Sequence, residues 1–123
     1  MPGSVNADDL KKRTKRFALD ALAFARTLPS TDEAKAVSRQ LIRAATGVGS
    51  NYRATCRARS RAEFVARIGV ALEEADESAF WLEIIVDGKL SAARRAIELL
   101  DEANELSAIL AQSSITASQA LGH

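Results

Sequence analysis

The sequence predicts an all-α protein folded as an antiparallel, up-down-up-down four-helix bundle. Hydrophobic residues make up 47% of the chain, while Gly and Pro number only 6 and 2, a composition that favours helix over strand. Apolar residues recur every three or four positions through four separate stretches, as they do on the buried face of a helix. With 123 residues the chain is expected to form one domain, residues 1–123, with frayed termini.

The most informative local signal is the pair Ser60 and Glu63, which divides the apolar stretch from Gln40 to Val86. Their Ser-x-x-Glu spacing is that of a capping box, in which each side chain binds a free backbone N–H at a helix start. One helix is therefore expected to end near Arg57 and the next to begin just after Ser60. A link this short makes the two helices antiparallel neighbours.

Cap and turn residues predict the remaining boundaries. Asn6 is expected to cap the first helix, and a Leu-Pro turn ends it before Ser30 or Thr31 caps the second. An Asp-Gly turn precedes a fourth helix starting near Ser91, and the Ser- and Ala-rich residues from Ser113 are expected to extend it only briefly. The predicted helices cover residues 7–27, 32–57, 61–86 and 91–112.

The centre of the second predicted helix consists almost entirely of small residues and includes Gly47 and Gly49. A glycine inside a helix costs about 1 kcal/mol relative to alanine, so we expect close approach of another helix backbone to offset that cost. A phosphate-binding Gly-x-Gly loop is the alternative, but no strand precedes the pair and neither the Walker nor the dinucleotide spacing is present. Leucine at either position should destabilise the protein by about 1–3 kcal/mol through overpacking.

The end of the third predicted helix, residues 80–86, is apolar almost all the way round. One bundle core covers only one face of a helix, so the surplus residues must be buried elsewhere. A subunit interface is the natural place, formed by Phe80, Trp81, Ile84 and Ile85. The alternative is that the core of the bundle widens at this end and absorbs Trp81.

The net charge of +1 conceals an asymmetry between the two halves of the chain. Residues 1–61 contain 13 Lys or Arg against 5 Asp or Glu, whereas residues 62–123 contain 4 against 11. Either antiparallel neighbours neutralise each other within one bundle, or the molecule has oppositely charged sides through which subunits meet. The basic run of the first helix can bind phosphate or form a solvated helix face, and it comprises Lys11, Lys12, Arg13, Lys15 and Arg16.

The acidic run of the third helix has a structural interpretation. Folding the second helix onto the third brings Arg43 level with about residue 75, from where it can reach Glu74 or Glu77. A carboxylate metal site in a bundle normally needs Glu-x-x-His motifs, and the only histidine is the terminal His123. Cys56 has no histidine nearby in the chain to activate it. We therefore expect no catalytic residues, no metal, no cofactor and no enzymatic activity.

Several of these residues together resemble a known family. They are Gln40-Leu41-x-Arg43, Thr46-Gly47-Val48-Gly49-x-Asn51, the acidic run of residues 73–77, and Trp81-Leu82. From about Arg13 to Leu110 the chain resembles the S23-type four-helix-bundle proteins, also called 23S rRNA intervening-sequence proteins. That resemblance implies a ring-shaped homopentamer with no established enzymatic activity. It carries over Arg43, Asn51, Glu77 and Trp81 as structural or interface positions.

The expected function is that of a non-enzymatic, oligomeric bacterial scaffold or binding module whose partner is itself, as a homopentamer. The alternative is a nucleic-acid-binding accessory protein that uses the basic face of the first two helices, because a related branch of the family binds nucleic acid and a reverse transcriptase. The chain has no run of about 20 apolar residues and no signal-peptide pattern. We therefore expect a cytoplasmic protein without a membrane partner.

Overall fold

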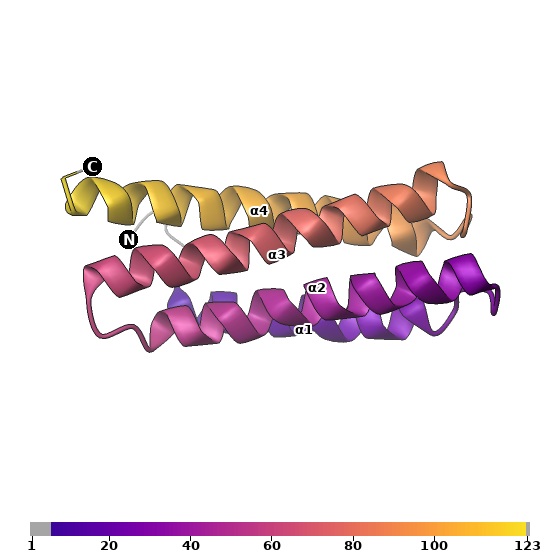
Figure 1. Ribbon diagram of the computed structural model, residues 1–123, viewed down its shortest axis with the longest axis horizontal. Helices are drawn as coiled ribbons and strands as arrows, with labels where there is room; N and C mark the ends of the chain where they lie inside the picture. Colours follow the sequence, from indigo (N-terminus) through magenta and orange to yellow (C-terminus); the bar gives the residue numbers. More distant parts are fainter. Residues whose placement is uncertain (1–5, 123) are drawn as a thin grey trace.

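The computed structural model describes residues 6–122, which form four antiparallel helices. These are α1 (Ala7–Ala25), α2 (Asp32–Cys56), α3 (Arg61–Asp87) and α4 (Arg94–Ala120). Each helix packs against two others, because α1 contacts α2 and α4 while α3 contacts the same two helices. Figure 1 shows the helices lying side by side along the long axis, with the connections at alternate ends. The predicted fold class, an up-down-up-down four-helix bundle, is confirmed.

The first three helices begin at residues that cap them with side chains. The side-chain oxygens of Asn6, Thr31 and Ser60 accept hydrogen bonds from N–H groups two or three residues ahead, at 2.7, 3.2 and 3.0 Å. The capping box at α3 differs from the expected reciprocal form, because the Glu63 carboxylate accepts from the N–H of Arg59 at 3.2 Å. Each cap binds an N–H group that the first helical turn leaves without a partner.

The turn before α4 is longer than predicted, so the helix begins at Arg94 instead of near Ser91. The N–H of Leu90 donates to the carbonyl of Ile85 at 3.0 Å, which ends α3 in a Schellman arrangement. The residue in the left-handed conformation of this turn is Lys89, with φ 57°. Ser91 acts inside the turn, where its hydroxyl accepts from the N–H of Ala93 at 3.1 Å.

Two predicted helix ends were wrong. Helix α1 ends at Ala25 rather than near residue 27, because the N–H groups of Thr27 and Leu28 donate to carbonyls only three residues back, at 2.9 and 3.2 Å, in a tighter closing turn. Helix α4 continues to Ala120 instead of ending near residue 112. Both α3 and α4 contain 27 residues, so an antiparallel α4 must extend this far to cover the start of α3. Ala117, within the extension, is only 2% exposed.

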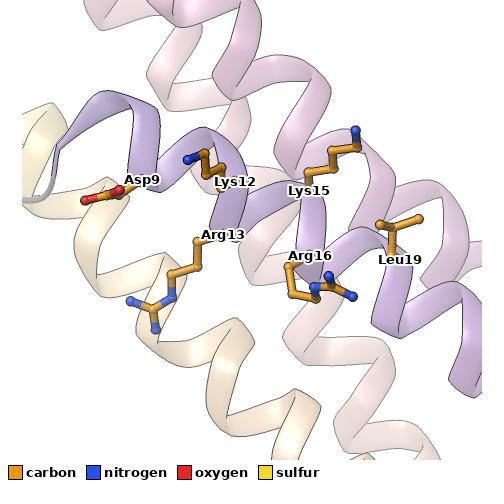
Figure 2. A pocket seen from close by; sticks show the side chains of 6 residues that line it. All are labelled: Asp9, Lys12, Arg13, Lys15, Arg16 and Leu19. Atoms are coloured by element: carbon orange, nitrogen blue, oxygen red, sulfur yellow. The ribbon is translucent and has the colours of Figure 1, made fainter.

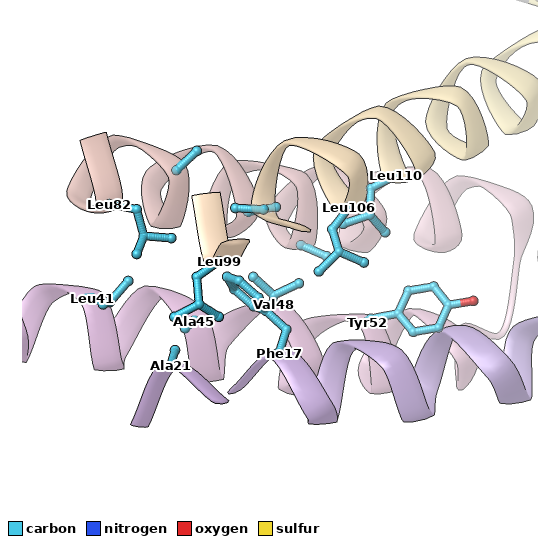
Figure 3. Packing of buried hydrophobic residues seen from close by; sticks show 14 of the residues in the cluster. Phe17, Ala21, Leu41, Ala45, Val48, Tyr52, Leu82, Leu99, Leu106 and Leu110 are labelled. Atoms are coloured by element: carbon cyan, nitrogen blue, oxygen red, sulfur yellow. The ribbon is translucent and has the colours of Figure 1, made fainter. Parts of the chain in front are cut away.

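The core runs along the bundle and receives large side chains from every helix (Figure 3). Alanines such as Ala45 and Ala75 are fully buried beside these side chains, which lets neighbouring backbones lie close together. The largest fully buried apolar residues are Phe17, Leu41, Val48, Ile68, Leu82, Ile85, Leu106 and Leu110. Within residues 6–122, no helix is both long and apolar enough to cross a membrane.

Candidate interaction surfaces

Arg43 connects α2 to α3 through two carboxylates. Its Nη1 atom lies 3.6 Å from Oε2 of Glu74, and its Nη2 atom contacts Oε1 of Glu77. This placement agrees with the register expected from the sequence. Glu77 also lies 3.5 Å from the indole Nε1 of Trp81. Because the Arg43 side chain is 51% exposed, these pairs contribute modest stability and mainly fix how α2 aligns with α3.

Gly47 and Gly49 have different neighbours. A Cβ atom at Gly49 would lie 3.5 Å from the backbone of Thr14, so the expected close approach of a helix backbone occurs here, against α1. At Gly47 the expectation of a neighbouring backbone was wrong, because a Cβ there would overlap the Glu74 carboxyl group, 2.9 Å from its Cδ atom. Asn51 is on the same side of α2, and its side chain donates to the carbonyl of Gly47 at 2.8 Å.

The side chain of Glu74 is largely buried beside Gly47. Its side chain is only 18% exposed, and this burial raises the pKa of Glu74 above its ordinary value, although Arg43 acts in the opposite direction. The carboxylate lies against α2 in the space that the missing Cβ of Gly47 leaves.

Three apolar side chains form a surface cluster on α3, which we call the α3 patch: Phe80, Trp81 and Ile84. Phe80 is 49% exposed and Ile84 is 37% exposed, while Trp81 is half-buried. The rings of Phe80 and Trp81 meet edge to face, with centroids 5.0 Å apart. Ile85, which was expected to share this surface, is fully buried in the core. The surplus apolar surface is therefore smaller than the sequence indicated.

Ion pairs join α1 to α4 along the side of the bundle that no turn connects. Arg13 donates from Nε and Nη2 to both carboxylate oxygens of Glu102, at 2.8 and 2.6 Å, and also lies 3.4 Å from Glu105. Arg95 of α4 lies 3.0 Å from Asp20 of α1. Part of the charge asymmetry is therefore neutralised within the bundle. Arg13 binds α4, so it is removed from the candidate nucleic-acid contacts.

Within residues 6–122, the other cations of the basic run form no ion pair with α4. Figure 2 shows Arg13 directed toward α4 and Lys15 on the opposite side of α1. Within residues 6–122, α1 alone lines the hollow beside these side chains, so it is a shallow surface feature rather than an enclosed site. Among the described residues, Lys11 and Arg16 pair only with acids of their own helix and at long range, 3.9 Å from Asp8 and 3.9 Å from Asp20.

A narrower groove runs between α1 and α2. It has a volume of about 200 Å³, and its lining combines cations with small and hydroxyl residues: Lys11, Lys15, Ala18, Thr46, Gly49, Ser50 and Arg53. The sequence indicated a role for the two lysines and Gly49, but not that Thr46, Ser50 and Arg53 line a groove with them. Thr46 belongs to the family motif but was not predicted to line a groove, and no motif marks Ser50 or Arg53. Only the packing of α2 against α1 brings the three residues to this groove.

The described residues offer little catalytic chemistry. Within residues 6–122, no three His, Cys, Asp or Glu side chains are arranged so that they could hold a metal ion. Cys56 is a half-buried free thiol near the end of α2.

The comparison with protein families identifies the family of this chain. The model of the 23S rRNA-intervening sequence proteins matches residues 8–112. The chain belongs to the 23S rRNA-intervening sequence protein family. A structure from Bacteroides thetaiotaomicron, described as a protein with unknown function from the S23 ribosomal protein family, resembles this member of the family with a TM-score of 0.78. It shares 25% identity over 85% of this chain and 97% of that chain. No curated protein matches the chain.

These comparisons confirm the family that the residue pattern resembled. Neither the family description nor the similar structure indicates an enzymatic class.

Proposed function

We propose that the protein is a non-enzymatic scaffold whose subunits assemble head to tail into a ring. The observation that supports this proposal most directly is the α3 patch, which exposes 49% of Phe80 and 37% of Ile84 beside Trp81. Single exposed apolar residues are normal on a monomer, whereas a contiguous cluster containing two aromatic rings is typical of a binding surface. Aromatic side chains are also the residues most enriched at the centre of interfaces.

The charges around the α3 patch suggest the character of the surface that it meets. Glu73, Asp76 and Glu83 are exposed on α3, whereas α1 and α2 expose an excess of cations. An acidic rim around an apolar centre is complementary to the basic side of a second copy. Such charges increase the association rate and fix the orientation, while the apolar centre provides affinity. Because the two surfaces differ, the contact is heterologous, and heterologous contacts close into a ring when the rotation between subunits permits.

The size of the chain is compatible with two such contacts. A standard interface buries about 800 Å² on each partner, and every subunit of a ring makes two contacts. The chain exposes 7310 Å², so a ring would cover roughly a fifth of its surface. The number of subunits that we propose, five, is implied by the family resemblance.

Sedimentation equilibrium tests the assembly directly. We expect the wild-type protein to sediment as an oligomer, and a single mass of 13.2 kDa at micromolar concentration would refute the proposal. Replacing Phe80 and Ile84 by serine should dissociate the ring without unfolding the bundle, because both side chains are exposed. Ile97→Ser with Ile115→Ser is the matched control, since these α4 residues are 51% and 52% exposed but lie outside the α3 patch. Dissociation of the control alone would place the interface elsewhere.

Trp81→Ala combined with a charge reversal on α4 is a further test of the same contact. Glu102 and Glu105 are unsuitable for the reversal because they bind Arg13 within the subunit. Asp101 is exposed on the same helix and makes no ion pair among the described residues, so Asp101→Lys is the better choice.

A second candidate function is nucleic-acid binding through the basic side of α1 and α2. The observation that favours it is that Lys12 and Lys15 are exposed and form no ion pair within residues 6–122. Unpaired cations on one side of a domain attract phosphates, even when the net charge is close to zero. Binding of a generic RNA at low salt would support this candidate, and its absence would exclude it.

A further inference from the structure

The groove between α1 and α2 is built by the close approach of the two helices. Gly49 and Ala18 are the smallest residues in its lining, and the backbone of α1 at Thr14 lies 3.5 Å from where a Cβ of Gly49 would be. Because these residues are small, the longer side chains on either side stand above them. The result is a polar channel along the helix pair rather than a flat surface.

Three cations line this channel from both helices. Lys11 and Lys15 are one helical turn apart on α1, about 6 Å along the axis, and Arg53 faces them from α2. Lys15 and Arg53 form no ion pair among residues 6–122, and the pair of Lys11 with Asp8 is 3.9 Å long and exposed. Arg13 and Arg43, in contrast, are bound to carboxylates of α4 and α3. Within residues 6–122, the cations of the groove are thus among those that form no ion pair with another helix of the bundle.

Two hydroxyl groups complete the α2 side of the groove. Thr46 donates to the carbonyl of Ile42 at 2.7 Å, a good hydrogen bond within its own helix. Ser50 donates to the carbonyl of Gly47 at 3.3 Å, which is longer than a typical O–H···O bond. The Ser50 hydroxyl therefore loses little when it turns outward to donate to an anion.

We propose that this groove binds the phosphate backbone of a nucleic-acid strand, with Lys11, Lys15 and Arg53 as phosphate contacts and Ser50 as a hydrogen-bond donor. The inference rests on the second candidate function and names the site that carries it. No aromatic residue among residues 6–122 lines the groove, so bases have no surface to stack on and binding is independent of sequence. The described part of the lining also lacks the large apolar side chains that anchor a protein to an anionic membrane surface.

The salt dependence of RNA binding measures the number of phosphate contacts. Three contacts with a single strand give a slope of about −2 in a plot of log affinity against log salt concentration. The affinity of the wild-type protein for a short, fluorescently labelled single-stranded RNA should therefore fall roughly 20-fold between 50 and 200 mM salt. Lys15→Ala with Arg53→Ala removes two contacts, so the fall should shrink to roughly threefold over the same range.

Lys35→Ala with Arg39→Ala is the matched control, because it removes one lysine and one arginine that are exposed on α2, form no ion pair among residues 6–122 and lie outside the groove. The control should keep the wild-type slope. Sedimentation measures the mass of all three proteins, so that slopes are compared between proteins in the same state of assembly. No RNA binding by the wild type at low salt would refute the second candidate function and the groove together. If the control lost RNA binding and the groove variant kept it, the protein would still be a nucleic-acid binder, but the groove would not be its binding site. Equal affinity for phosphatidylserine vesicles would also overturn the assignment to nucleic acid.

Discussion

Substitution of Gly47 by alanine tests how α2 and α3 fit together. In an unobstructed helix this change stabilises the protein by about 1 kcal/mol, because alanine is the better helix former. Here the new Cβ would overlap the Glu74 carboxyl group, with Cδ at 2.9 Å, and overpacking typically costs about 1–3 kcal/mol. The obstacle is the end of a flexible side chain, so we expect the lower end of that cost and almost no net change in the free energy of unfolding.

The same substitution should behave differently once the obstacle is removed. In a Glu74→Ala background, Gly47→Ala should recover its full gain of about 1 kcal/mol, which corresponds to about 4 °C in Tm for a chain of this length. Urea unfolding of the two single variants, the double variant and the wild type gives the coupling energy, which we expect to be about 1 kcal/mol. Equal stabilisation by Gly47→Ala in both backgrounds would show that Glu74 does not occupy the space beside this glycine.

Three further predictions concern single residues. Burial raises the pKa of Glu74 above its ordinary value of 4.5, so the stability that its protonated form provides should be lost as the pH rises through the raised pKa. Glu74→Gln should reduce the change in unfolding free energy with pH around the raised pKa. An unchanged pH profile would show that burial does not raise the pKa of Glu74. Ser107→Ala should raise the unfolding free energy by about 1 kcal/mol, because the buried hydroxyl has no hydrogen-bond partner among the described residues. Lys89 has φ 57°, a conformation that glycine adopts at lower cost, so Lys89→Gly should stabilise the protein by about 0.5–1 kcal/mol and raise Tm by a few degrees. A lower Tm would argue against the left-handed turn.

The sequence predicted the fold because cap residues and apolar spacing act locally. Asn6, Thr31 and Ser60 bind N–H groups only two or three residues away, so their roles are visible in the chain itself. The end of α4 was not visible in this way, because its Ser- and Ala-rich extension is held by packing against the start of α3 rather than by its own composition. Tertiary packing overrides a weak local preference in such a segment.

The candidate sites likewise include some contacts that the sequence predicts and others that depend on tertiary packing. The pairing of Arg43 with Glu74 and Glu77 follows from helix length and a short turn, which fix the register of α2 on α3. The binding of Arg13 to Glu102 joins residues 89 positions apart in the chain, and periodicity alone does not indicate which of five neighbouring cations makes it. Arg53 was missed for the same reason, since its role depends on how α2 rotates against α1.

The ion-paired side of the bundle has a consequence for how the protein opens. Helix α1, with 19 residues, is the shortest of the four and has no turn that links it to α4. Charged pairs between α1 and α4 weaken as salt screens them, whereas apolar packing between α3 and α4 does not. We therefore expect α1 to separate from α4 in local openings before α3 does, so that its amide protons exchange fastest among the helices and faster still in concentrated salt. Local opening of the bundle is therefore expected to begin at the contact between α1 and α4.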